Sequence, residues 1–568
     1  MHGPVAIKEN GVNLVERLLD WERREPQRAW LFQPTDGIER AWNFAEVAGE
    51  VRRAAAAIRA LGLPPGSRLG ITGRNTAHWI IADLAIAMAG HVAVGLYPRQ
   101  GKATLGYVLD HAGVRHVFIG PSLMAGDAEE MVANLPAGVQ IIALPYASLP
   151  RTDLGWADFL DGHAPLSDYT PPPADTLAML IYTSGTSGQP KGVMLSNANI
   201  TFAIDNILRN TMAPLPREVL FSYLPLAHLM ERVFGEAMGL AVGAELHFLE
   251  KPEALAATLA RVAPTRFSGV PLVYARVQAG ILGKLPQHKL DRLLRLPLVN
   301  RWFRKTLRRK MGLQNVESLG CGAASAPLPM IEWFEKLGLP INQGYGMTET
   351  CAYAAVELPG VRRLGSVGKP LPDSGFRLAA DGEIQFRHGG VMMGYFKDPA
   401  QTAAAFTDDG WLRTGDRGRI DADGFLYVTG RIKDEFKTGK GKYVVPVPIE
   451  GAMARSTDLE QLCLVGAGLN QPILLATLSP NGKARERAGL EAALRADLAT
   501  VNATLAEHER IAQCLIVEGA WTPDNGLVTP TGKIRRPVIE AHYAELLARC
   551  VQRREQAVCW QAELEARA

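Results

Sequence analysis

The stretch Leu177–Gly192 (LAMLIYTSGTSGQPKG) joins a short apolar run to a loop of glycines, hydroxyl side chains and one lysine. Such a run is typical of a buried strand. Gly185 and Gly188 allow backbone N–H groups to converge on an anion, and Lys191 adds a positive charge. The hydroxyl side chains are those of Thr183, Ser184, Thr186 and Ser187. The pattern predicts a phosphate-binding loop that differs from the Walker loop, with a helix opened by Ser196 and Asn197 after it.

Similar apolar runs recur before and after this loop, separated by helical stretches. They are Arg68–Thr72, His116–Ile119, Leu177–Tyr182, Glu218–Leu224, Glu245–Leu249 and Arg266–Val270. Short apolar strands that alternate with helices predict an α/β fold with parallel-rich sheets covered on both faces. Ligands bind such folds where loops leave the carboxyl ends of the strands.

The chain of 568 residues is long enough for at least two domains. We expect a large N-terminal domain over residues 1–430, in which residues 365–430 form a β-rich subdomain marked by Asp-Gly turns. Residues 431–568 are expected to form a small, mobile α+β C-terminal domain, with a hinge near residues 431–437. Apolar runs at Leu462–Val465, Ile473–Leu478 and Leu515–Val517 supply its strands.

Charge, cysteine usage and hydropathy exclude several classes. The net charge of +3 gives no global field for nucleic acid, and the six scattered cysteines include no CxxC pair, which favours free thiols in the cytoplasm. The N-terminus lacks the pattern of a signal peptide. The most apolar window, Trp79–Gly95, contains Asp83 and His91, so a buried helix is expected there. Membrane contact is expected to be at most peripheral, at the inner face.

The densest basic run is Arg301–Lys310 (RWFRKTLRRK). We interpret it as one solvated face of an amphipathic helix, with Trp302, Phe303 and Leu307 packed inward. Contact with acidic lipid or phosphate is the alternative.

The phosphate loop, Tyr182–Gly192 (YTSGTSGQPKG), resembles that of the adenylate-forming superfamily of acyl-CoA synthetases, luciferases and peptide-synthetase adenylation domains. Further motifs follow in that family's order and cover nearly the whole chain. The resemblance implies ATP and Mg²⁺ as cofactors, with the loop residues Thr183–Gly188 and Lys191 holding the nucleotide. Thr183 and Glu349 are the implied Mg²⁺ ligands.

Gln343–Thr350 (QGYGMTET) resembles the family's adenine and metal motif. It implies that Tyr345, beside Gly346, stacks on adenine, that Thr348 contacts the α-phosphate and that Glu349 holds Mg²⁺, for which a carboxylate is a suitable hard ligand. Upstream, the small residues of Gly320–Pro327 let the backbone approach the adenine edge. Those assigned to the nucleotide are Gly322, Ala323 and Ala324, although Cys321 and Ser325-Ala326 depart from the usual run.

Three later motifs complete the resemblance. Trp411–Asp416 (WLRTGD) puts Asp416 at the end of a short turn, where it implies a carboxylate on the ribose hydroxyls. In Gly430–Lys437 (GRIKDEFK), Arg431 is implied to reach the ribose and Lys433 to be the hinge pivot. Lys437, with the loop to Lys442, is implied to face the site during thioester formation.

In Thr529–Arg536 (TPTGKIRR), Lys533 matches the catalytic lysine. A mobile ammonium suits negative charge on phosphorus and on an incoming carboxylate. The extra Lys440 and Lys442 either meet CoA phosphates or belong to a solvated loop.

Substrate choice is indicated by Leu224–Arg232 (LPLAHLMER), which resembles the signature of long- and medium-chain fatty acyl-CoA synthetases. His228 either borders the substrate carboxylate or is a structural histidine. Phe267–Pro271, where the family lines its acyl channel, carries no charge, which favours an apolar tail. The segment Tyr97–Gly101 departs from the family pattern without a clear consequence.

The sequence therefore predicts an AMP-forming acid–thiol ligase that makes an acyl-adenylate from a fatty acid and passes the acyl group to CoA. The absence of a Ser-His-Asp grouping fits chemistry that rests on positioning and charge neutralisation. The alternatives are a fatty acyl-AMP ligase that loads a carrier protein, an aryl-acid CoA ligase, and a non-catalytic nucleotide-binding scaffold.

Overall fold

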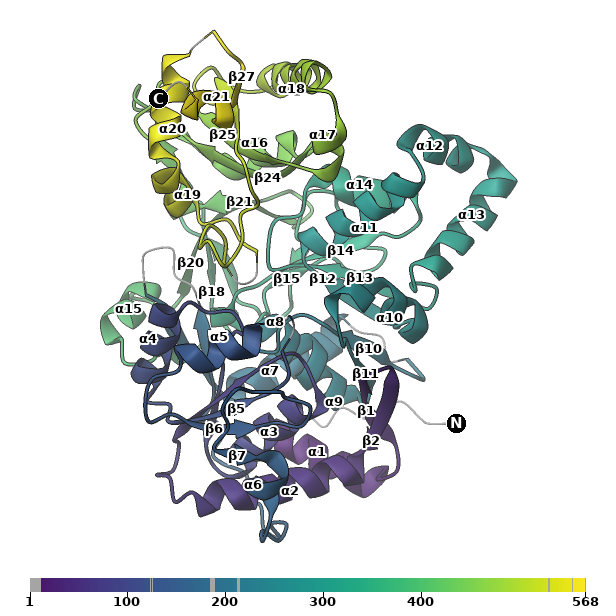
Figure 1. Cartoon of the computed structure of the whole chain (residues 1–568), viewed down its shortest axis with the longest axis vertical. Helices are drawn as coiled ribbons and strands as arrows, with labels where there is room; N and C mark the ends of the chain where they lie inside the picture. Colours follow the sequence, from purple (N-terminus) through teal and green to yellow (C-terminus); the bar gives the residue numbers. More distant parts are fainter. Residues whose placement is uncertain are drawn as a thin grey trace.

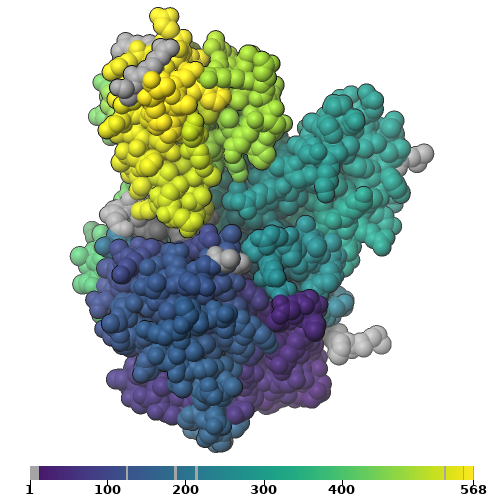
Figure 2. Space-filling model, viewed as in Figure 1, coloured from purple at the N-terminus to yellow at the C-terminus, as the bar shows by residue number. Residues whose placement is uncertain are grey.

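The computed structural model describes residues 12–122, 124, 126–183, 189–211, 215–529, 532–553 and 555–566. Its sheets are mixed and its helices cover them, so the predicted α/β class is confirmed. A separate C-terminal domain, yellow and lime in Figures 1 and 2, sits at one end of the larger N-terminal part.

The largest sheet has eight strands in the order β19-β9-β8-β4-β3-β5-β6-β7. The strands are β3 (Arg68–Thr72), β4 (Val92–Gly95), β5 (His116–Ile119), β6 (Gln140–Ala143), β7 (Leu154–Gly155), β8 (Leu177–Thr183), β9 (Lys191–Ser196) and β19 (Gly394–Tyr395). Strands β8 to β7 run parallel, whereas β9 is antiparallel to both β8 and β19.

The sequence analysis missed β9. The phosphate loop therefore links two antiparallel strands, and the expected helix, α7 (Asn197–Thr211), begins only after the second of them. Ser196 and Asn199 cap this helix reciprocally: each side-chain oxygen accepts a hydrogen bond from the other residue's backbone N–H, at 3.1 and 3.0 Å.

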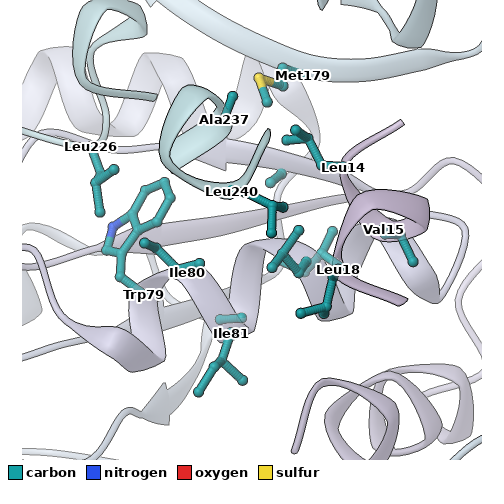
Figure 3. Close-up of a cluster of buried hydrophobic side chains, with 14 of the residues drawn as sticks. Leu14, Val15, Leu18, Trp79, Ile80, Ile81, Met179, Leu226, Ala237 and Leu240 are labelled. Atoms are coloured by element: carbon teal, nitrogen blue, oxygen red, sulfur yellow. The ribbon is translucent and has the colours of Figure 1, made fainter. Parts of the chain in front are cut away.

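Helices pack on both faces of the large sheet. They are α1 (Leu14–Arg24), α2 (Phe44–Ala60), α3 (Ala77–Met88), α4 (Lys102–Ala112), α5 (Asp127–Asn134), α6 (Trp156–Leu160), α7, α8 (Leu229–Glu231), the π-helical η1 (Arg232–Ala237) and α9 (Met238–Val242). Figure 3 shows side chains of α1, such as Leu18, close to Ile80 of α3 and Leu240 of α9. The predicted buried helix at Trp79–Gly95 is α3, which ends at Met88 before a turn and β4.

Two further sheets flank this core. One has the order β10-β11-β1-β2, from β1 (Ala29–Thr35), β2 (Ile38–Asn43), β10 (Val219–Ser222) and β11 (Glu245–Phe248). The other has the order β12-β13-β14-β15-β16, from β12 (Arg266–Gly269), β13 (Ser318–Cys321), β14 (Ile341–Tyr345), β15 (Ala355–Val356) and β16 (Lys369–Pro370). Its helices are η2 (Pro252–Ala254), α10 (Leu255–Val262) and α14 (Leu328–Lys336).

Three helices, α11 (Pro271–Lys284), α12 (Gln287–Arg295) and α13 (Pro297–Lys310), form an arm: α11 packs beside α14, and α12 and α13 project at the right of Figure 1. Phe303 and Leu307 pack against a buried cluster, as predicted. The prediction for Trp302 is wrong, because its ring is 67% exposed. Phe303 and Leu307 take the inner face of α13 and leave Trp302 on the outer one.

The next segment forms an antiparallel sheet in the order β17-β18-β20-β21. Its strands are β17 (Phe376–Leu378), β18 (Glu383–Phe386), β20 (Leu412–Ile420) and β21 (Leu426–Arg431), and α15 (Pro399–Ala405) lies in the β19–β20 connection. The position of Asp416 was predicted wrongly: it lies within β20 and pairs across the sheet with Arg431. A register shift follows at Arg417/Gly418, and Gly415 has a φ of +68°, which is why the sequence reads as a turn.

The C-terminal domain has its own sheet, β24-β25-β26-β27. Its elements are η4 (Ile432–Asp434), β22 (Phe436–Lys437), β23 (Tyr443–Val444), α16 (Pro446–Met453), β24 (Leu459–Val465), β25 (Ile473–Leu478), α17 (Pro480–Ala484), α18 (Arg487–Asn502), β26 (Gln513–Ile516), α19 (Arg536–His542), α20 (Ala544–Gln552), β27 (Val558–Trp560) and α21 (Gln561–Glu565). All six cysteines are buried free thiols. Within the described part of the chain, no helix has the length and apolar composition needed to span a bilayer.

Candidate active site

Tyr345 and Asp416 meet where β14 and β20 come together. The Tyr345 hydroxyl donates a hydrogen bond to Asp416 Oδ2 at 2.8 Å, and Arg431 Nε lies 3.1 Å from Asp416 Oδ1. Burial, followed by the charge of Asp416, raises the pKa of Tyr345 well above its ordinary value, so the hydroxyl stays protonated and donates. The carboxylate is thus held from both sides and fixed in orientation.

Glu349 lies in the short 3₁₀ segment η3 (Thr348–Thr350) directly after β14. It is buried, and its Oε1 accepts a hydrogen bond from the Tyr395 hydroxyl at 2.9 Å. The Lys191 ammonium lies 4.8 Å from the centre of the Tyr395 ring. Strand β19 therefore carries Tyr395 to a position between the predicted metal ligand and the predicted phosphate-binding lysine.

The backbone around Tyr345 leaves no room for larger side chains. A Cβ at Gly346 would lie 2.7 Å from the carbonyl oxygen of Ala352. Gly322, Ala323 and Ala324 follow directly on β13, which is parallel to β14, and Ala323 has a φ of +65°. These small residues stand at the carboxyl ends of two neighbouring strands, which is where open α/β sheets bind their ligands.

The ends of the phosphate loop are well defined. Thr183 closes β8 and pairs with Lys191, the first residue of β9. Between them, the predicted phosphate ligands Ser184, Gly185, Thr186, Ser187 and Gly188 lie outside the described residues. Burial and the nearby charge of Lys433 lower the pKa of Lys191, while Glu349 acts in the opposite direction. Lys191, Lys433 and Glu349 are therefore close enough to interact electrostatically.

Lys533 belongs to the C-terminal domain but faces this cluster. It lies on a tight turn in which its backbone N–H donates to the Thr529 hydroxyl at 3.0 Å and its carbonyl accepts from the Thr529 N–H at 2.8 Å. The Lys533 side chain keeps accessible surface, yet loss of surrounding water and the charge of Arg431 lower its pKa. Asp416 and Glu349 oppose that shift, so Lys533 lies within electrostatic reach of all three groups.

His228 caps the short helix α8, where its Nδ1 accepts a hydrogen bond from the Met230 N–H at 3.2 Å. Burial, aided by the charge of Lys533, lowers the pKa of His228 to about 4. The imidazole is therefore neutral at pH 7, with Nδ1 as the acceptor. Nearby Glu231 is buried, and its burial raises the pKa of its carboxyl to about 8. Glu231 is thus a neutral acid at pH 7, a feature that the sequence motif alone did not indicate.

Lys437 does not join this cluster. It lies in β22, exposed, with its ammonium 5.6 Å from the centre of the Tyr443 ring in the same domain. The Lys440 ammonium pairs with Glu507 at 3.1 Å. Neither the contact with CoA phosphates nor the solvated loop, the two interpretations of Lys440 and Lys442, included this partner. The structure thus brings Lys533 to the Asp416–Glu349 cluster, whereas Lys437 lies against Tyr443 of its own domain.

Sequence reasoning also missed two contacts at this site. Tyr395 lies in a short strand of only two residues, too brief for any periodicity to reveal it. Arg99, in the unusual Tyr97–Gly101 segment, pairs with Asp127 at 2.8 Å and reaches Asp524 of the C-terminal domain at 3.3 Å. This second ion pair joins the two domains in the orientation that brings Lys533 to the cluster.

Two family models match the chain. The one described as AMP-binding enzyme covers residues 19–396, and the one described as AMP-binding enzyme C-terminal domain covers residues 434–555. The chain belongs to the AMP-binding enzyme family. It is similar to a long-chain-fatty-acid–CoA ligase of Mycobacterium bovis, 29% identical over 95% of this chain and 97% of the relative. A long-chain-fatty-acid–CoA ligase of Homo sapiens is 30% identical over 77% of this chain and 72% of the relative.

Two solved structures share the fold of this chain. The adenylation domain of a carboxylate reductase from Mycobacterium chelonae aligns with a TM-score of 0.79, at 21% identity, over 96% of this chain and 92% of that one. An anthranilate CoA ligase in complex with anthranoyl-AMP aligns with a TM-score of 0.77, at 22% identity, over 94% of this chain and 98% of that one.

Proposed function

We propose that this member of the AMP-binding enzyme family is an ATP-dependent ligase that activates a medium- or long-chain fatty acid as its acyl-adenylate and transfers the acyl group to CoA. One observation carries the proposal. Four cations from three separate stretches of the chain, Lys191, Arg431 with Lys433, and Lys533, gather around two carboxylates, Glu349 and Asp416. The excess of positive charge suits a polyphosphate.

In the proposed first half-reaction, a carboxylate oxygen of the acid attacks the α-phosphorus of ATP and pyrophosphate leaves. Tyr345 and Asp416 would hold the adenosine, and Lys191 and Thr348 the phosphates. The Lys533 ammonium would stabilise negative charge on phosphorus and on the incoming carboxylate. His228, whose imidazole is neutral at pH 7, would border the path of that carboxylate without adding a charge.

The chemistry of the donor set fits one divalent cation. Among the described residues, the Tyr395 hydroxyl is the one hydrogen-bond donor to the Glu349 carboxylate, which leaves lone pairs for a hard metal ion, with the Thr183 hydroxyl as the second proposed ligand. Mg²⁺ held there would neutralise charge on the phosphates. Tyr395 orients the carboxylate for that purpose.

In the second half-reaction, the CoA thiolate attacks the acyl carbonyl and AMP leaves. We propose that the C-terminal domain, residues 431–568, turns about Lys433 so that Lys437 replaces Lys533 at the site. Support comes from the exposed position of Lys437 while Lys533 faces the nucleotide side.

The fatty acid is proposed because the curated relatives above are named long-chain-fatty-acid–CoA ligases. Acid-dependent ATP–pyrophosphate exchange with C6–C18 acids, benzoate and cinnamate tests this choice. We expect the C12–C18 acids to give the highest kcat/KM, and preference for an aryl acid would overturn the assignment. AMP release that requires a carrier protein in place of CoA would assign the acceptor to the alternative.

A further inference from the structure

Positive charge is concentrated on the projecting arm. Residues 271–310 carry eleven Lys and Arg side chains and one acidic residue, Asp291, a net charge of +10. Because the whole chain carries only +3, the other 528 residues have a net charge of −7. The arm is thus a basic projection on an otherwise acidic protein, and long-range attraction to an anionic partner would act on this part first.

Most of these cations are not neutralised within the molecule. No arm lysine or arginine forms an ion pair with a carboxylate of the described residues. Arg304 and Arg308 instead donate hydrogen bonds to backbone carbonyls, at 2.8 Å to Lys336 and 3.1 Å to Val316, which hold α13 to the domain. Arg301, Lys305 and Arg309 remain exposed at successive turns of α13.

Large apolar side chains are exposed in the same place. Leu296, between α12 and α13, is 48% exposed, and Val299 and Trp302 on α13 are 37% and 67% exposed. Val299, Trp302 and Lys305 follow one another at three-residue spacing, so they share one face of the helix. The turn between α12 and α13 lies at the outer edge of the molecule, and Figure 2 shows the arm standing clear of the body.

We propose that this arm docks the protein on an anionic lipid bilayer, with Leu296, Val299 and Trp302 entering the headgroup region and the surrounding cations binding lipid phosphates. Exposed Trp and aliphatic residues flanked by Lys and Arg are the composition of interfacial helices. A polynucleotide would use the cations but leaves Leu296 and Val299 without a partner, so the bilayer accounts for more of the surface.

The arm is also well placed to serve the proposed active site. Helix α11 begins at Pro271, the last residue of the predicted acyl-channel segment, and its 14 residues span about 20 Å toward α12 and α13. Leu272, at the start of α11, lies against Gly532 beside Lys533. A docked arm would hold this channel segment near the bilayer, where long-chain acids partition. This easier access of the acid to the channel rests on the proposed function, whereas the docking of the arm on a bilayer does not.

Vesicle co-sedimentation of the full-length protein tests the docking. We expect the protein to bind phosphatidylcholine vesicles that contain 30 mol% phosphatidylglycerol and to bind pure phosphatidylcholine vesicles little. Binding to the anionic vesicles should weaken as the salt concentration rises. The triple variant Arg301→Glu/Lys305→Glu/Arg309→Glu should lose at least about 100-fold in partitioning, since each basic residue near such a surface contributes about one factor of five and the three factors multiply. Trp302→Ala should lose about 5-fold.

A matched control reverses the charge of three exposed lysines outside the arm, Lys102→Glu/Lys251→Glu/Lys483→Glu. None of the three pairs with a carboxylate of the described residues. It should bind within about twofold of the unaltered protein. The proposal is overturned if the unaltered protein binds both vesicle types equally, if the arm variant and the control lose affinity alike, or if the protein binds heparin or RNA but no vesicle. ATP–pyrophosphate exchange with soluble octanoate, measured on every variant, reports separately on fold and on the proposed function.

Discussion

The Tyr345 hydroxyl offers a sharp test of how the nucleotide site is organised. Tyr345→Phe keeps the ring for stacking but removes the donor that lies 2.8 Å from Asp416 Oδ2. A hydrogen bond to a charged group contributes about 1.5–3 kcal/mol. Because Arg431 still holds the other oxygen at 3.1 Å, we take the lower end, about 1.5 kcal/mol. The KM for ATP should therefore rise about tenfold, with kcat changed less than about threefold.

Steady-state kinetics with ATP as the varied substrate and saturating acid and CoA give the KM for ATP and the kcat of each variant. Tyr427→Phe is the matched control, since the Tyr427 hydroxyl donates to Asp421 Oδ2 at 3.1 Å in a similarly part-buried contact outside the site. It should leave the KM within twofold. If Tyr345→Phe also leaves the KM within twofold while its thermal midpoint is unchanged, the hydroxyl does not orient Asp416 for the ribose, and that role fails.

Two further predictions concern charge. Lys533→Ala should reduce ATP–pyrophosphate exchange by at least about 100-fold with nearly unchanged ATP binding. Lys437→Ala should slow thioester formation from preformed adenylate more than it slows exchange. If Lys437→Ala instead slows both half-reactions equally, the assignment of the two lysines to different half-reactions is wrong. Because the pKa of folded His228 is about 4 against 6.5 in the unfolded chain, the unfolded state binds more protons between these values, so stability should fall as pH drops through that window. His228→Gln should flatten this part of the denaturant-measured stability profile, and a profile identical to that of the unaltered protein would contradict the buried neutral imidazole.

Much of the fold could be predicted because its strands are short apolar runs with clear ends. Arg68–Thr72 and His116–Ile119 match β3 and β5 residue for residue, and Ile473–Leu478 matches β25. Strand β9 escaped because its first residues belong to a glycine-bearing loop motif, which obscured the apolar Val193–Leu195 that follows. The position of Asp416 escaped because Thr-Gly-Asp is typical of a turn and only the partner strand, β21, makes it part of a sheet.

Side-chain exposure on α13 was harder still. A helical period shows that Trp302, Phe303 and Leu307 cannot all point the same way, since Trp302 and Phe303 are adjacent. It does not show which of them the domain will cover. The Lys336 and Val316 carbonyls, which receive Arg304 and Arg308, decide it by fixing the rotation of the helix. Such contacts come from segments distant in sequence, and no local pattern contains them.

The Arg99–Asp524 pair makes the balance between the two half-reactions sensitive to the medium. It spans two domains, both side chains are partly exposed, and ions in solution weaken such pairs. In the proposed rotation, Asp524 would move away from Arg99 with its domain. Raising the ionic strength would therefore weaken the arrangement in which Lys533 lies near Asp416 and Glu349 more than the other arrangement. Low ionic strength would then favour formation of the adenylate, and high ionic strength would favour its conversion to the thioester. The turnover rate should therefore depend on salt even where the affinity for substrate does not.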